Sequence, residues 1–204
     1  MQLHRRDVVA KATQLLDDYG LADLTMRRLA RELNVSPGAL YWHFADKQEL
    51  LGAVADRILE PTTRVEAHSA WQDGMTAVSS ALRDALLSTT DGAELVSATF
   101  AAGKSAALID ILTRLSSAAT EAGIDRAHAE LVARTVVHYV LGFTADEQSR
   151  LQWDAAGALS DEQSILTVDP SARFAFGLHL LVTGVAHAPV PRHGNVRQIV
   201  GRPD

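Results

Sequence analysis

The stretch LTMRRLARELNVSPGALYWHFADKQELL, residues 24–51, contains two short helical patterns separated by a turn. Thr25 can cap the first helix, in which apolar residues recur at helical spacing. Ser36 can cap the second helix, with Pro37 at its first position, where the missing N–H of proline costs nothing. Two helices joined by so short a turn predict a helix-turn-helix, a unit whose second helix enters the major groove of DNA.

The side chains of this stretch match what such a unit needs. Gly38 and Ala39 are small enough for the second helix to approach DNA closely, and the basic first helix can reach phosphates. Leu40 and Phe44 fit a core stripe, which leaves the rings between them for DNA. We predict DNA contacts from Thr25, Arg27, Arg28, Ser36, Pro37, Gly38, Ala39, Tyr41, Trp42, His43 and Lys47.

Plainer interpretations exist for each of these residues. Arg27 and Arg28 alone would fit a solvated face, and Gly38 would fit simple turn chemistry. Tyr41 and Trp42 could be partly buried. Together, at this spacing, these residues indicate a DNA-binding helix-turn-helix far more specifically than any one of them does.

The whole stretch resembles the DNA-binding domain of the tetracycline-repressor family. The family pattern T-x-R-x-L/I-A, a hydrophobic turn, a short helix ending L-Y-x-H-F and a following K-x-x-L are all present. The segments WQDGMTAVSSALRDALLSTTDGAELV, VHYVLGF and FAFGLHLLVTGV extend the resemblance over most of residues 4–187. It implies a homodimer that binds near-palindromic double-stranded DNA and is released by a small-molecule effector. Met26 and residues 37–39 differ from the base-reading groups of the tetracycline repressor itself, so we expect a different operator.

Helical periodicity continues along almost the whole chain, so we predict an all-α fold. A three-helix DNA-binding domain is expected at 1–47, a connecting helix at 48–61 and a ligand-binding and dimerisation domain at 62–187. The tail at 188–204 is expected to be disordered, and residues 154–169 to form a loop. Capping boxes are predicted from Asp46 to Glu49 and from Asp91 to Glu94, and Pro61 should end or kink the fourth helix.

The last predicted helix, from Pro170, is apolar nearly all round. Phe174, Leu178 and Val185 fall on one stripe, whereas Phe176 and Leu180 fall on another. Such a helix is either central to its own chain or buried against a partner. We favour a four-helix dimer interface shared with helix 125–153, with an intramolecular core as the alternative.

The effector site follows only from the resemblance. Tetracycline repressors hold a magnesium–drug chelate through a histidine and a threonine, and the matching positions here are Val96 and Thr99. Because valine cannot ligate a metal, we expect an apolar or weakly polar effector rather than magnesium–tetracycline. His138 is either a pocket residue or a satisfied core histidine. The predicted ligand-binding set is Thr63, Val78, Leu82, Val96, Thr99, Phe100, Ala133 and His138.

Composition excludes several functional classes. The chain has no cysteine, and its histidines lack the spacing of a helical zinc pair, so we predict no metal site. We also predict no cofactor and no enzyme activity, because no nucleophile–base pair, phosphate loop or paired-carboxylate signature is present. The N-terminus has no unbroken apolar region, and no run of about 18 apolar residues occurs, so we expect a cytoplasmic protein without a membrane partner.

Charge divides the chain into two parts. Residues 1–57 carry eight basic and eight acidic side chains, so the formal net charge of −6 resides in residues 58–204. Together these features predict a ligand-responsive DNA-binding regulator, of the repressor type, with the helix that joins the domains as its lever. The alternative is a helical small-molecule-binding protein without specific DNA binding. A third possibility, a helical enzyme, is not supported by any recognisable set of catalytic residues.

Overall fold

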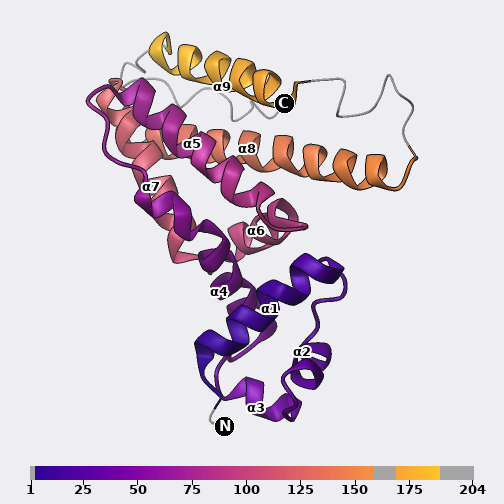
Figure 1. Cartoon of the computed structure of the whole chain (residues 1–204). Helices are drawn as coiled ribbons and strands as arrows, with labels where there is room; N and C mark the ends of the chain where they lie inside the picture. Colours follow the sequence, from indigo (N-terminus) through magenta and orange to yellow (C-terminus); the bar gives the residue numbers. More distant parts are fainter. Residues whose placement is uncertain (1–2, 159–168, 189–204) are drawn as a thin grey trace, which may run out of the picture.

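The structure is a computed structural model that describes residues 3–158 and 169–188. Every regular element in those ranges is a helix, which confirms the predicted all-α class (Figure 1). In chain order the elements are α1 (Arg5–Tyr19), α2 (Met26–Glu32), α3 (Pro37–Tyr41), α4 (Lys47–Leu59), the 3-10 helix η1 (Glu60–Arg64), α5 (Trp71–Leu87), α6 (Gly92–Ala102), α7 (Ala106–Glu121), α8 (Arg126–Ala155) and α9 (Pro170–Ala186).

The small domain packs α1, α2, α3 and the start of α4 around one apolar core, at the bottom of Figure 1. Leu29 from α2 and Leu40 from α3 are fully buried there. The turn between these helices passes through Asn34, whose φ of 54° is left-handed, a conformation that asparagine tolerates better than most residues. The N–H of Val35 donates to the carbonyl of Ala30 at 3.0 Å, so the chain reverses within four residues.

The fourth helix belongs to both domains. It packs against α1 in the small domain and against α6 and α7 in the larger one. It ends at Leu59, directly before Glu60 and Pro61, as the proline predicts. Helix α4 therefore connects the packing of the two domains.

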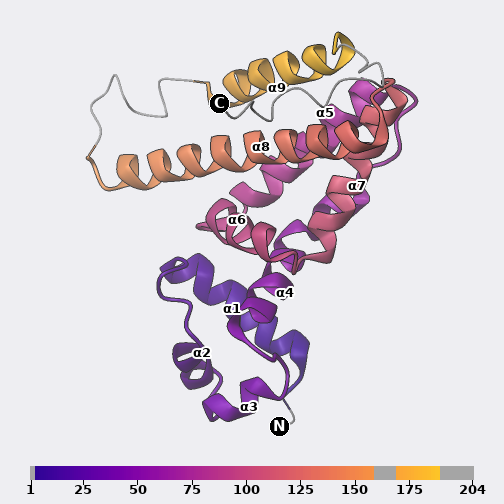
Figure 2. The ribbon, with the colours of Figure 1, turned by 180° about the vertical axis from the view of Figure 1, so that it is seen from behind.

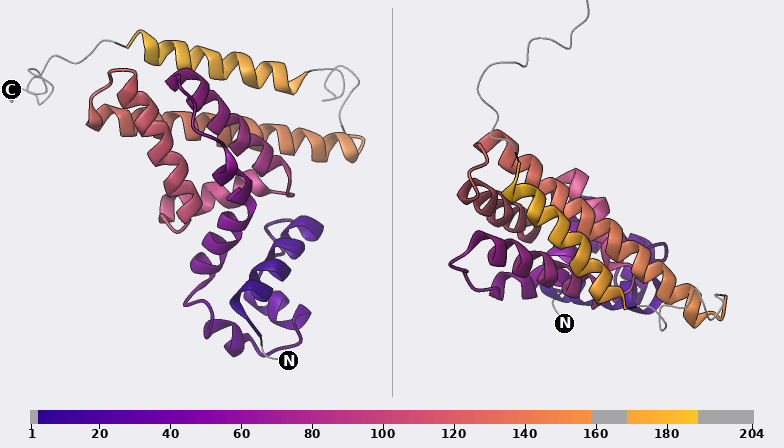
Figure 3. Two further views of the ribbon diagram at one scale, coloured as in Figure 1. Left: turned by 60° about the vertical axis from the view of Figure 1, so that its left-hand side comes forward. Right: turned by 90° about the horizontal axis from the view of Figure 1, so that it is seen from above.

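In the larger domain, α8 runs the full length and packs against α5, α6 and α7. Figures 1 and 3 show α9 lying along α8 on the side that faces away from the small domain. Seen from behind in Figure 2, α6 lies between α8 and the small domain. Helix α6, like α5 and α7, therefore contacts both α8 and α4.

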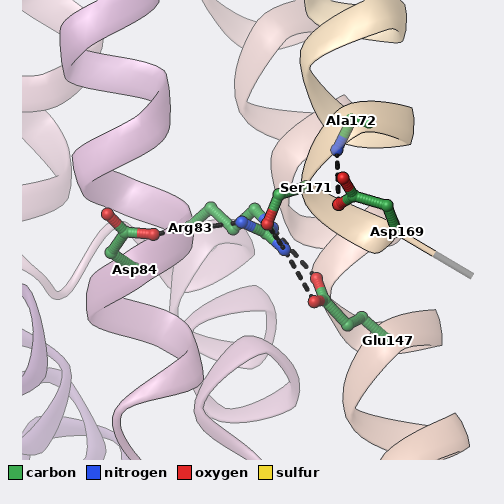
Figure 4. Close-up of polar contacts among 6 residues, drawn as sticks. All are labelled: Arg83, Asp84, Glu147, Asp169, Ser171 and Ala172. Atoms are coloured by element: carbon green, nitrogen blue, oxygen red, sulfur yellow. Dashed lines mark hydrogen bonds and ion pairs between the residues drawn. The ribbon is translucent and has the colours of Figure 1, made fainter. Parts of the chain in front are cut away.

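A buried ion pair ties α9 to this bundle (Figure 4). Arg83 on α5 donates through Nε and Nη2 to the two carboxylate oxygens of Glu147 on α8, at 2.9 and 2.6 Å. Nη2 also lies 3.4 Å from Oγ of Ser171 in the first turn of α9, and the guanidinium is 5.1 Å from the ring centre of Phe174. One arginine thus holds three helices together.

One predicted capping box is wrong and the other is half formed. Asp91 precedes α6 with φ 54°, and its side chain makes no capping bond. Its carboxylate instead accepts the N–H of Leu21 at 2.9 Å and Nε2 of Gln152 at 2.7 Å, so a tertiary contact replaces the local one. Asp46 does accept the N–H of Glu49 at 2.7 Å, but the carboxylate of Glu49 binds the residue before Asp46.

The predicted end of the long helix and the predicted tail fall partly outside the described residues. Helix α8 continues to Ala155, two residues beyond the expected 153. Residues 159–168 of the predicted loop and residues 189–204 of the predicted tail lie outside the described part of the chain. Within the described part, no single helix is long and apolar enough to cross a membrane; α6 and α7 meet that test only as a pair bent by 81°.

Candidate DNA-binding surface

Hydroxyl caps fix the starts of α2 and α3. Oγ1 of Thr25 accepts the N–H of Arg28 at 3.1 Å, and Oγ of Ser36 accepts the N–H of Ala39 at 3.3 Å. Each cap satisfies an amide that the helix itself leaves unpaired. Pro37 occupies the first turn of α3, as predicted. The caps place α3 at the end of the molecule opposite the larger domain (Figure 1).

Helix α3 separates core from surface as its sequence predicts. Leu40 and Phe44 are 0 and 1 % exposed, whereas Tyr41 is 53 % and Trp42 is 90 % exposed. A tryptophan this exposed has no packing role in its own domain, and an exposed large aromatic suggests a binding surface. The indole N–H and the phenol O–H can both donate to phosphate oxygens or base edges.

The two adjacent arginines of α2, Arg27 and Arg28, lie in different surroundings. Arg27 is exposed. Arg28 forms an ion pair with Asp23, and its guanidinium lies 3.9 Å from the ring centre of Tyr19. These contacts hold Arg28 against the small domain, which leaves Arg27 as the freer candidate for a phosphate contact.

The other predicted residues lie on the same neighbouring segments. Thr25 is exposed at the start of α2, and His43 and Lys47 are half-buried between α3 and α4. Helices α2 and α3 contact each other, so the predicted set forms one region of the small domain. The exposed members at the start of α3 are Ser36, Pro37 and Gly38, and Ala39 is half-buried beside them.

Arg5 was not part of the predicted site, yet it holds α3 in place. Its Nη1 donates to the carbonyl oxygen of His43 and to Oε1 of Glu49, and its guanidinium lies 4.1 Å from the ring centre of Phe44. The N–H of Ala45 also donates to Glu49 at 2.7 Å, and these two hydrogen bonds lower the pKa of Glu49. In the sequence Arg5 is one of two adjacent arginines and cannot be told from a solvated charge.

The predicted effector residues are mostly packed inside the larger domain. Val78, Leu82, Val96, Thr99 and Ala133 are each 3 % exposed or less. Their side chains fill space between the helices rather than line an opening. An effector that used them would have to separate α5, α6 and α8.

The remaining three lie nearer the surface. Thr63 is exposed on η1. The rings of Phe100 and His138 are 5.1 Å apart, and His138 lines a groove of about 700 Å³ between α6 and α8. His138 is the one member of the predicted set that lines this groove. Over residues 3–158 and 169–188, no group of three histidine or carboxylate side chains is arranged to hold a metal.

The first contact between the DNA-binding domain and α6 lies at the start of that helix. Oδ1 of Asp17 on α1 accepts the N–H of Thr90 at 2.9 Å. The N–H of Leu21, just after α1, donates to Asp91 at 2.9 Å. These bonds connect the end of α1 directly to the turn that begins α6.

The second contact lies just beyond the end of α6. Gly52 on α4 packs so closely against the backbone oxygen of Lys104 that a Cβ atom would collide with it. One turn later, Asp56 accepts Oγ–H of Ser105 at 2.7 Å and the N–H of Ala107 at 3.0 Å. Helix α6 therefore touches the DNA-binding domain and its lever near both ends.

Solved structures share this arrangement. A crystal structure of Mycobacterium smegmatis BioQ is 60% identical in sequence, with a TM-score of 0.84 over 91% of this chain and 98% of that chain. A structure of BioQ with its natural double-stranded DNA operator is 55% identical, with a TM-score of 0.77 over 91% of this chain and 99% of that chain.

Sequence comparisons agree. The tetracycline repressor protein class G of Vibrio anguillarum is 30% identical over 202 residues, which are 90% of this chain and 93% of that protein. The sequence model of the bacterial regulatory proteins of the tetR family matches residues 8–54, and that of the tetracyclin repressor-like C-terminal domain matches residues 66–160. The chain therefore belongs to the tetR family of bacterial regulatory proteins.

Proposed function

We propose that this protein is a dimeric transcriptional repressor that binds a near-palindromic operator in the cytoplasm and leaves it when an effector binds. The observation that carries the proposal is the exposed edge of α3, with Tyr41 at 53 % and Trp42 at 90 % exposure. The same fold has been solved with a double-stranded DNA operator in BioQ. An exposed recognition helix supported by a buried core is what docking into a major groove requires.

The dimer is supported by an unpartnered apolar face. Leu131 on α8 and Phe176 and Leu180 on α9 are 59, 65 and 56 % exposed, although the opposite face of α9 is buried through Phe174 and Leu178. Large apolar side chains gathered on a surface mark an interaction site. Two copies of α8 and α9 would make the four-helix interface that the sequence predicts.

A dimer gives the effector a means of control. Two recognition helices must lie about one DNA turn apart, ~34 Å, to dock together. Contacts near both ends of α6 hold the small domain, so a shift of α6 changes that spacing. A coupling of about 1–3 kcal/mol is enough to change operator occupancy noticeably. The apolar character of the effector stays a prediction from the substituted pocket positions.

The direct test measures, by fluorescence anisotropy, how tightly the protein binds the DNA that flanks its own gene. We expect Trp42→Ala to lower affinity about 10-fold or more, since one good base or phosphate contact contributes about 1–3 kcal/mol. Trp153→Ala, at the far end of α8 and 55 % exposed, is the matched control and should bind like the unaltered protein. If both variants bind the DNA with equal affinity, α3 is not part of the DNA interface.

Salt dependence tests the phosphate contact separately. Arg27→Ala should weaken binding on every sequence and reduce the slope of affinity against salt by about one per protomer. Arg126→Ala removes an equally exposed arginine at the start of α8, in the larger domain, and should leave the slope unchanged.

The alternative, a small-molecule-binding protein that has lost specific DNA binding, makes the opposite prediction. The acidic balance of residues 58–204 and the substituted base-reading positions favour it. Under that reading, the unaltered protein binds the flanking DNA no better than a shuffled sequence. Members of this family are generally DNA-binding regulators rather than enzymes, so turnover of a small molecule would be needed to support an enzyme.

A further inference from the structure

The groove between α6 and α8 combines an apolar wall with an acidic rim. It encloses about 700 Å³ and is open to solvent on one side. Ala98 from α6 and Gly142 and Ala145 from α8 supply exposed nonpolar surface, whereas Asp91 and Glu94 supply carboxylates. Among the residues that the structure describes, neither a lysine nor an arginine lines it. The size fits a small organic ligand.

We propose that this groove binds a small amphipathic molecule that carries a cationic amine, and that the bound molecule weakens the hold of α6 on the DNA-binding domain. The inference rests on the proposed function, and it replaces the apolar effector expected from the sequence with an amphipathic, cationic one at a different site. The nonpolar part of the molecule would cover Ala98, Gly142 and Ala145. The ammonium group would lie by the two carboxylates, which no basic lining residue neutralises.

The coupling runs through Asp91. One carboxylate oxygen accepts the N–H of Leu21 at 2.9 Å, and the other accepts Nε2 of Gln152 at 2.7 Å. Asp91 therefore lines the groove and holds the end of α1 with the same carboxylate. The fit is tight, since a Cβ atom on Gly20 would lie 2.7 Å from the oxygen that binds Leu21. An ammonium group in the groove competes with the Leu21 amide for that oxygen.

The other contacts at the start of α6 are buried hydrogen bonds, so we expect a bound ligand to disturb mainly the bonds of Asp91. Gln148 is 9 % exposed, accepts the N–H of Ala93 at 3.1 Å, and donates to the carbonyls of Leu86 and Thr89 at 3.0 and 2.8 Å. These bonds anchor the start of α6 to α5 and α8. A ligand that enters the groove meets a rigid wall and one shared carboxylate.

This groove is distinct from the site that the family resemblance implies. Val96 and Thr99 are 0 and 1 % exposed, whereas Glu94, Ser97 and Ala98 are exposed on another face of α6. Entry into the groove requires no separation of packed helices, unlike entry between Val96 and its neighbours.

The absence of cysteine from the chain permits a clean test. Ser97→Cys places a thiol in the groove, and Ser117→Cys places one at an exposed position on α7 that does not line it. Each variant is labelled with a methanethiosulfonate reagent that attaches either a trimethylammonioethyl or a sulfonatoethyl group. Operator affinity is measured by anisotropy, and exchange of the Leu21 amide is measured by NMR.

We expect the cationic label at position 97 to lower operator affinity about 10-fold and to speed exchange of the Leu21 amide. The direction is diagnostic, because added positive charge by itself strengthens attraction to DNA. The anionic label at 97 should act no more strongly than the same label at 117. If both labels at 97 match their counterparts at 117 in affinity and exchange, the inference is overturned. If the unlabelled proteins do not bind the flanking DNA, the proposed function is wrong. Exchange of the Leu21 amide, compared between labels at 97 and 117, then still tests whether a cation in the groove weakens the bond to Asp91.

Discussion

Breaking the ion pair between Arg83 and Glu147 should cost far more than breaking any surface pair. Their side chains are 9 and 6 % exposed, and two hydrogen bonds of 2.9 and 2.6 Å join them (Figure 4). Glu147→Gln leaves the buried guanidinium with only the exposed carboxylate of Asp84, 4.0 Å away, and Arg83→Met leaves a buried carboxylate without a partner charge. Removing one partner of such a pair costs about 3–5 kcal/mol. For a chain of this size, that corresponds to a fall of about 6–20 °C in the unfolding midpoint.

The double variant separates a buried charge from a packing defect. Arg83→Met with Glu147→Leu removes both charges and keeps apolar volume, so it should lie within about 2 kcal/mol of the unaltered protein. Additive single costs would instead give about 6–10 kcal/mol. Urea unfolding at two or more protein concentrations measures each value, because dimer stability depends on concentration.

A surface pair provides the control. Glu130→Gln breaks an exposed i, i+4 pair with Arg134 on α8 and should cost less than about 1 kcal/mol. Single variants at Arg83 and Glu147 that cost no more than this control would show that the buried charges are not the reason α9 stays attached. A double variant as unstable as the sum of the singles would refute the reasoning equally.

Three further predictions follow from other contacts. Gly52→Ala should destabilise the protein by about 1–3 kcal/mol in urea unfolding, because its Cβ collides with α6–α7 backbone, whereas Gly74→Ala has room and should be neutral or slightly stabilising. Glu49 has a lowered pKa in the folded protein, so the stability that its contact with Arg5 contributes is fully present above the ordinary pKa of 4.5 and is lost as pH falls through the lower folded value. The free energy of unfolding should therefore fall less steeply with decreasing pH for Glu49→Gln than for the unaltered protein. Phe176→Glu should yield monomers in sedimentation analysis without unfolding them, because that side chain is 65 % exposed; a stable dimer would place the interface elsewhere.

The DNA-binding half of the molecule could be predicted from sequence because its signals are local. A cap, a proline and small residues occur within four positions of α3, and the i, i+4 spacing of Leu40 and Phe44 decides which rings are exposed. Each of these features acts within one or two helical turns, so no knowledge of the tertiary fold is needed. The same periodicity places Phe174 and Phe176 on different stripes of α9, but it does not decide which stripe is buried within the chain.

Contacts between distant segments gave no such signal. Asp91 followed by Glu94 has the form of a capping box, but the carboxylate of Asp91 binds Leu21, 70 residues away. Tertiary competition of this kind overrides a local preference of about 1 kcal/mol. Arg5 and Gln148 likewise look like ordinary surface residues in the sequence, although one supports α3 and the other anchors α6.

The division of charge explains how an acidic protein can bind DNA at one end. The larger domain carries all of the net charge of −6, and at physiological salt this field decays over about 8 Å. Figure 1 places α3 at the far end of the small domain, away from the larger domain. There the charge is balanced, and Arg27 is exposed while Arg28 is paired with Asp23. We expect affinity to combine phosphate contacts from exposed arginines such as Arg27 and Arg31 with contacts by Tyr41 and Trp42 in both protomers at once. Under the proposed function, such a regulator depends on the spacing of its two recognition helices, which a small movement of α6 would change.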